Sequence, residues 1–150
     1  MSNWKDRLVG AVLAEFPGAS PATDFFIESS PDGPVIKVWN EDVLGPYVEA
    51  DWQAKCEALM AVEFVEAVKL QIAQRITSVA SASTQMNLTA AHSAGLLTPE
   101  QQAAYLAGLG WIAATRQRGK ELVAAHDPDF AEDEKWPLLP DGVAELAALF

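Results

Sequence analysis

Residues that cross-link, bind metals or catalyse are scarce in this sequence. It contains one cysteine, Cys56, and two histidines, His92 and His126, in 150 residues. A lone thiol cannot close an intramolecular disulfide, and no Cys/His spacing resembles a zinc site, a composition typical of a reducing cytosol. Cys56 has no histidine nearby in sequence and is interpreted as a buried, inert thiol. His92 and Ser93 are neighbours in sequence but do not form a triad motif, so a catalytic role for His92 is not favoured. His92 is instead expected to pack near a helix end.

Motifs for catalysis or cofactor binding are also missing. The sequence has no glycine-rich phosphate-binding loop. An acidic run lacks the glycine and the spacing of an EF-hand loop; it consists of Asp127, Asp129, Glu132, Asp133 and Glu134. Solvated charge is the favoured interpretation of this run, with a metal site or a docking site for a basic partner as alternatives. We therefore expect no catalytic residue, no cofactor and no metal, and predict that the protein is not an enzyme.

Positively charged residues are few in this sequence. The chain carries 10 Lys and Arg residues against 21 Asp and Glu residues, a formal net charge of −11. Such a field repels phosphate backbones and anionic lipids, so we expect protein partners and neither nucleic acid nor membrane. Residues 1–16 mix charges into their apolar positions and do not resemble a signal peptide, and no later run has membrane-spanning length. The protein is expected to fold in the cytoplasm.

The remaining composition suits a folded helical protein. Half of the residues are hydrophobic and 21% are charged, which is ordinary for a globular chain of this length. The patterns predict a mainly α protein with a small N-terminal β-hairpin, folded as a single domain over residues 1–150.

An amphipathic helix is predicted over residues 1–16. Trp4, Leu8, Val12 and Phe16 recur every four residues, with Ser2 as a candidate cap. The resulting apolar stripe is expected either to dock on the core or to anchor the chain to a neighbouring subunit.

A β-hairpin is predicted over residues 24–39. Two short runs of β-branched and aromatic residues, Asp24–Glu28 and Val35–Trp39, flank the turn sequence Pro31–Pro34. Because a two-stranded hairpin is marginal in water, it must pack on a helix or on another chain. Trp39 is a candidate contact residue for such a neighbour.

A helical hairpin is predicted over residues 49–125, where acidic residues are rare: Glu100 is the one carboxylate between Glu66 and Glu121. The first helix either continues to Ala94 or kinks near Ser83. A continuous helix of about 70 Å, at roughly 1.5 Å per residue, would be too long for a compact domain. The alternatives are therefore a break or an elongated, oligomeric assembly.

The second helix of this hairpin has clear boundary signals. Gly95 can end the preceding helix, and Thr98, Pro99 and Gln101 form a capping box with proline at the first helical position. Gly108 and Gly110 are expected to permit close approach of another element. Residues 126–150 are predicted to form an acidic loop and a short C-terminal helix.

A candidate interface follows from apolar spacing. Val65, Val68, Ile72 and Val79 alternate by three and four residues, with Arg75 at an expected apolar position. This pattern fits either an ordinary core helix or a seam for self-association, so a homo-oligomer is expected. The full set of candidate interface residues is Trp39, Val65, Val68, Ile72, Val79, Leu106, Leu109 and Phe150.

The N-terminal third carries a family resemblance. Residues 24–40 read DFFIESSPDGPVIKVWN and are followed by Leu44–Pro46 and a helix that opens at Glu49. This order resembles small tailed-bacteriophage proteins of the tail-fibre and tail-assembly region, although Val35 and Val48 depart from it and no fibre repeat follows. The resemblance implies a structural or assembly role in phage tails, in the host cytoplasm or in the virion, and it transfers no catalytic residue. A chaperone or adaptor absent from the mature particle, or a small enzyme, are the alternatives.

Overall fold

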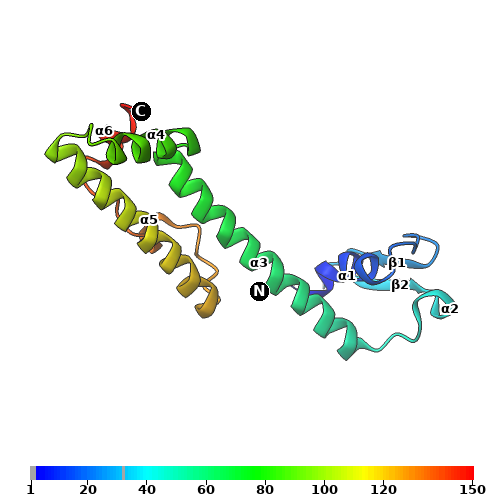
Figure 1. Cartoon of the computed structure of the whole chain (residues 1–150). Coiled ribbons are helices and arrows are strands. Elements are labelled where there is room, and N and C mark those ends of the chain that lie inside the picture. Colours follow the sequence, from blue (N-terminus) through cyan, green and yellow to red (C-terminus); the bar gives the residue numbers. More distant parts are fainter. Residues whose placement is uncertain (1–2, 32) are drawn as a thin grey trace. The chain divides into compact units, whose positions relative to one another are not determined.

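The computed structural model describes residues 3–31 and 33–150. Ser2, the predicted cap, and Asp32, in the predicted turn, lie outside the described residues. The protein is mostly helical with a two-stranded antiparallel sheet near its N-terminus, which confirms the predicted class (Figure 1). The chain divides into two compact units, residues 1–64 and 65–150. None of the helices in the described part of the chain is long and apolar enough to cross a membrane.

The first unit combines short helices with the hairpin. Its elements are η1 (Trp4–Arg7), α1 (Leu8–Glu15), β1 (Phe25–Glu28), β2 (Val35–Trp39), α2 (Glu41–Leu44) and the beginning of α3 (Glu49–Val79). The N-terminal helix thus opens with a 3-10 turn, and the Asn3 side chain caps it by accepting a hydrogen bond from the Lys5 amide at 3.1 Å.

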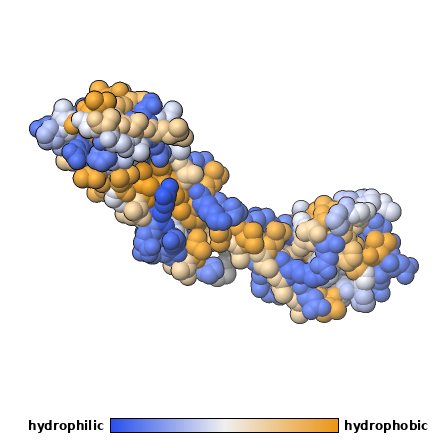
Figure 2. Space-filling model, viewed as in Figure 1, coloured by the Kyte–Doolittle hydropathy of each residue, from blue (hydrophilic) through white to orange (hydrophobic). Residues whose placement is uncertain are grey.

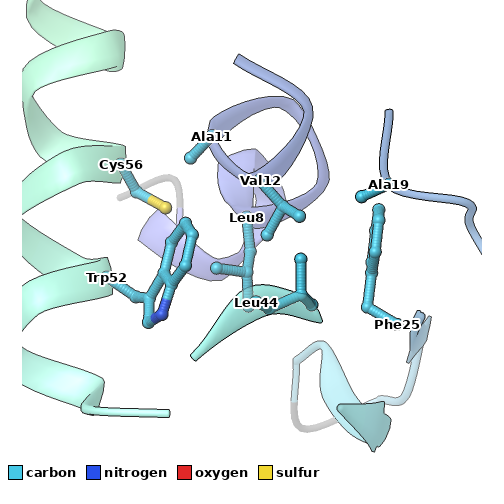
Figure 3. Packing of buried hydrophobic residues seen from close by; sticks show 8 residues of the cluster. All are labelled: Leu8, Ala11, Val12, Ala19, Phe25, Leu44, Trp52 and Cys56. Atoms are coloured by element: carbon cyan, nitrogen blue, oxygen red, sulfur yellow. The ribbon is translucent and has the colours of Figure 1, made fainter. Parts of the chain in front are cut away.

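The core of this unit lies between α1, the hairpin and α3. Leu8 and Val12 of the predicted stripe are fully buried, and Trp4 and Phe16 pack against the same cluster. Figure 3 shows Leu8 and Val12 gathered with side chains from β1, α2 and α3; the buried cluster is Leu8, Ala11, Val12, Ala19, Phe25, Leu44, Trp52 and Cys56. The N-terminal helix is therefore docked on the core of its own chain.

The hairpin is covered on one face. In the antiparallel register Phe25 pairs with Trp39 and Phe26 with Val38, and a bulge follows at Lys37. Phe25 is buried, whereas Phe26 and Val38 are 44% and 38% exposed on the other face. The predicted requirement for a covering element is met by the helices of the same unit.

The second unit contains the longer helices. Its elements are the remainder of α3, α4 (Ala82–Ser93), α5 (Pro99–Ala125), η2 (Asp133–Lys135) and α6 (Val143–Ala147). Hydrophobic residues gather in a band across the surface of this unit (Figure 2).

The long predicted helix is broken. Ser81 has a non-helical ψ of 163°, and its hydroxyl accepts a hydrogen bond from the Thr84 amide at 3.1 Å, which caps α4. The alternative with a break near Ser83 is therefore correct, and residues 49–125 form three helices.

The connection from α4 to α5 follows the predicted signals. At the end of α4, Gly95 has a φ of +68°, and the Leu96 amide donates to the Ala91 carbonyl at 3.0 Å. This is a Schellman ending, which needs a residue that tolerates positive φ. At the start of α5, the Thr98 and Gln101 side chains each accept from the other residue's amide, so the predicted capping box is confirmed.

α3 and α5 pack antiparallel inside the second unit. A Cβ at Gly119 would lie 2.9 Å from Ile72 Cγ1 and 3.6 Å from Val68 Cγ1, so these α3 side chains pack directly on the α5 backbone there. Glycine permits this contact because it has no side chain to occupy the space that Ile72 fills.

Candidate functional site

An apolar cavity of about 100 Å³ lies in the second unit. The end of α3 forms one wall, and α4, α5 and α6 form the others. The lining residues are Ile76, Val79, Ala80, Gln85, Leu88, Thr89, Ala104, Tyr105, Gly108, Leu109, Trp111, Ile112, Val143, Leu146 and Ala147. None of these residues is charged, which makes the cavity suited to an apolar side chain and not to an ion.

The C-terminal segment completes the cavity. Trp111 Nε1 donates to the Pro137 carbonyl at 3.1 Å and holds the chain that leads into α6. Gly108 lets α6 lie close to α5, since a Cβ there would be 3.3 Å from Val143 Cγ1. At the end of the chain, Asn87 Nδ2 donates to the Phe150 carbonyl at 3.1 Å. The expectation for Gly108 is thus confirmed, whereas that for Gly110 is wrong, because no described atom lies within 4 Å of a Cβ placed there.

The cavity opens beside α4 and α5. Two of its lining residues, Thr89 and Leu109, are exposed. Leu106, three residues before Leu109 on α5, is 55% exposed without lining the cavity. Tyr105, which lines the wall, stacks on the His92 ring with 4.5 Å between ring centroids. The exposed part of the lining therefore combines one apolar residue, Leu109, with one polar residue, Thr89, and the aromatic Tyr105 lies in the wall.

The candidate interface residues of the second unit divide into three groups. Val79 and Leu109 line the cavity, and Leu106 and Phe150 are exposed, so these four remain available for contacts. Val65 is half-buried at the beginning of the unit.

The other two, Val68 and Ile72, face α5 of the same chain. Val68 is completely buried and Ile72 is half-buried, and both lie against Gly119. That part of the predicted seam is thus covered within the unit.

Arg75 explains the interruption of the seam pattern. Its Nη2 donates to the Ala131 carbonyl at 3.2 Å and to Asp133 Oδ1 at 2.7 Å, and its guanidinium lies 5.0 Å from the Trp136 ring centroid. The arginine therefore ties α3 to the acidic segment of its own unit. The interpretation of this segment as freely solvated charge is too simple for Asp133, which is paired with Arg75.

Asp127 is paired as well. Lys135 Nζ donates a hydrogen bond to Asp127 Oδ2 at 2.8 Å, which lowers the pKa of Asp127 and raises that of Lys135. Among the described residues there is no group of three or more His, Cys, Asp or Glu side chains that could hold a metal ion.

In the first unit, the Trp39 ring is engaged by its neighbours. Its Nε1 donates to the Gly45 carbonyl at 2.9 Å, and its ring meets those of Tyr47 and Trp52 edge-on, each with a centroid distance of 5.1 Å. The ring is half-buried. The exposed apolar residues of the hairpin include instead Phe26, Val35 and Val38.

The residues considered for nucleophilic chemistry are not assembled in one unit. Cys56 is completely buried in the core of the first unit, and this burial raises the pKa of its thiol. His92 and His126 both belong to the second unit. The thiol thus has the buried environment that the sequence predicted.

Two residues of the cavity were missed by sequence reasoning: Trp111 and Val143 are buried in its walls. A short C-terminal helix with a docked Leu146 was predicted, but not the surface on which it docks. Searches of protein-family models, curated proteins and solved structures found no match to this chain.

Proposed function

We propose that this protein is a non-enzymatic, phage tail-associated structural or assembly protein that binds partner subunits through helix faces. The observation that carries the proposal is the uncharged cavity between α3, α4, α5 and α6, whose exposed lining residues include Leu109. Charged residues are depleted at the cores of protein interfaces, and apolar anchors fill pockets there. The assignment to phage tails is supported by the resemblance of residues 24–51, and no metal or cofactor is proposed.

The partners in this proposal are other copies of the chain and other tail proteins, met in the host cytoplasm during assembly. The net charge of −11 opposes binding to nucleic acid and to anionic membranes. The alternative function is a chaperone or adaptor that leaves before the particle is complete. The same helix faces would serve it, because a chaperone also needs an apolar surface that is free before its client arrives.

Purified particles of the encoding phage test the proposal. For a tail component, quantitative mass spectrometry should detect the chain in fixed proportion to the major tail protein. Its absence from particles, together with its capture by a tail protein from infected cells, would favour the assembly factor. If the chain is found neither in particles nor with any tail protein, the proposed function is wrong.

A further inference from the structure

We propose that the outward face of α5 binds an amphipathic helix of a different protein, one whose apolar side ends in carboxylates. The contact residues on this chain, here called the α5 stripe, are Leu106, Leu109, Ala113, Arg116 and Lys120. The inference rests on the proposed function, in which helix faces bind partner subunits, and it names the face and the chemistry of the partner.

The α5 stripe has the spacing of a helix-packing seam. Its members alternate by three and four residues, which places them along one side of the helix. All five are exposed, Leu106 by 55% and Leu109 by 47%. The opposite side of α5 is buried inside the unit through Gly108, Trp111, Thr115, Gly119 and Leu122. One side of α5 thus serves the core of the unit, and the α5 stripe is a second seam that faces away from it.

The two cations of the stripe differ from every other cation of the chain. Eight of the ten Lys and Arg residues form an ion pair with a carboxylate. Arg116 and Lys120 form none within the described residues, although the chain has 21 carboxylates. Both are exposed and lie four residues apart on the same side of α5. Two neighbouring cations without a carboxylate are therefore placed at one end of an apolar seam.

This arrangement specifies the partner. Amphipathic helices bind helix faces through apolar anchors spaced by three and four residues, and carboxylates on the partner would pair with Arg116 and Lys120. In an antiparallel pair the N-terminal turns of the partner lie beside these cations, and the helix dipole favours carboxylates there. Two copies of the stripe cannot satisfy each other, because it contains no carboxylate.

The acidic character of the whole chain does not oppose such a contact. From Ile76 to Lys120 the sequence has three cations and one carboxylate, Glu100, so all other carboxylates lie outside this segment. At physiological ionic strength the Debye length is about 8 Å, so distant exposed charges are largely screened whereas direct pairs are not. Local pairing with Arg116 and Lys120 therefore outweighs the net charge.

A designed peptide tests the inference with the full chain. The probe is an alanine-rich helical peptide of about 20 residues. It carries leucines at alternating spacings of three and four along one side, with two glutamates on that side at its N-terminal end. The matched peptide has glutamine at these two positions. In fluorescence anisotropy we expect the glutamate peptide to bind with a Kd below about 100 μM, about fivefold more tightly than the glutamine peptide.

Variants of the chain assign this preference to the two cations. Arg116→Gln combined with Lys120→Gln should make the two peptides bind alike. The matched control, Lys37→Gln combined with Lys69→Gln, removes the same charge from exposed positions outside the stripe and should leave the preference unchanged.

A second pair of variants tests the apolar part of the stripe. Leu106→Asp should weaken binding of both peptides at least about tenfold, because a buried leucine is lost from the contact. Leu70→Asp is the control, since Leu70 is 58% exposed on α3, and it should bind as the wild type does. Far-UV circular dichroism should show all variants folded.

The inference is overturned if the glutamate peptide does not bind at about 1 mM, or if the wild type binds both peptides equally. A preference that survives the loss of Arg116 and Lys120 would also overturn it. A wild-type dimer in sedimentation equilibrium that Leu106→Asp dissociates would show that a second copy covers the stripe instead. The particle experiment decides the proposed function separately, because it depends on the presence of the chain in particles and not on the peptides.

Discussion

Gly119→Ala should destabilise the second unit although alanine favours helix. The substitution adds a Cβ at the point where α5 meets α3, 2.9 Å from Ile72 Cγ1 and closer still to Ile72 Cδ1. Real Cβ atoms do not tolerate this distance, so Ile72 or a helix must shift. Replacing glycine with alanine inside a helix raises the free energy of unfolding by about 1 kcal/mol. Overpacking lowers the free energy of unfolding by about 1–3 kcal/mol. The expected net loss is therefore about 1 kcal/mol.

Gly110→Ala is the matched control on the same helix. No described atom lies within 4 Å of a Cβ at this position, so the helix preference is gained without the clash. We expect this variant to be about 1 kcal/mol more stable than the wild type. The difference between the two variants, about 1–3 kcal/mol, then isolates the overpacking cost. Urea unfolding followed by far-UV circular dichroism measures both values.

Ile72→Val in the Gly119→Ala background provides the rescue. Valine lacks Cδ1, the atom nearest to the added methyl group. In the wild-type background, Ile72→Val should lower the free energy of unfolding by about 0.5–1.5 kcal/mol. In the Gly119→Ala background the same change should lower it by clearly less. The reasoning is refuted if Gly119→Ala stabilises the protein as much as Gly110→Ala, since α3 and α5 would then have room for a side chain.

Two further predictions concern the segment that follows α5. Arg75→Met should lower the free energy of unfolding by about 1 kcal/mol, because it loses a carbonyl hydrogen bond and an ion pair whose acidic partner, Asp133, is 89% exposed. Asp133→Asn should lower the free energy of unfolding by less, because the hydrogen bond to the Ala131 carbonyl remains. Equal losses for the two variants in urea unfolding would contradict this ranking. Asp127→Asn should weaken the acid dependence of stability: the bond from Lys135 lowers the pKa of Asp127 in the folded state, so its contribution is complete above the unfolded pKa and disappears as pH falls through the folded pKa. If the free energy of unfolding falls with decreasing pH to the same extent in Asp127→Asn as in the wild type, this prediction is wrong.

Local chemistry made the helix boundaries near residues 95–101 predictable. The capping box needs only Thr98 and Gln101, which lie three residues apart, and Gly95 ends the preceding helix by its own backbone freedom. The strands 25–28 and 35–39 were predictable for a similar reason, because alternation and turn residues are visible within a few positions.

Long-range contacts could not be predicted in the same way. Arg75 looked like a defect in an apolar seam, and its partner Asp133 is 58 residues away in sequence. The cavity draws its lining from four helices between residues 76 and 147, so no local pattern encodes it. The break at Ser81 was expected only as one of two alternatives, because serine and threonine lower helix propensity without fixing a boundary. Contacts between distant residues decided the first two cases, whereas the Ser81 hydroxyl, which caps α4, marks the break.

The closed turn between α4 and α5 has an energetic consequence for recognition. Leu96 is 74% exposed, yet its amide is bound to the Ala91 carbonyl and the capping box begins two residues later. Ordering a backbone residue costs about 1–2 kcal/mol in entropy, and here folding has already met that cost. A partner that contacts Leu96 would thus meet a preorganised backbone and keep more of its interaction energy as affinity.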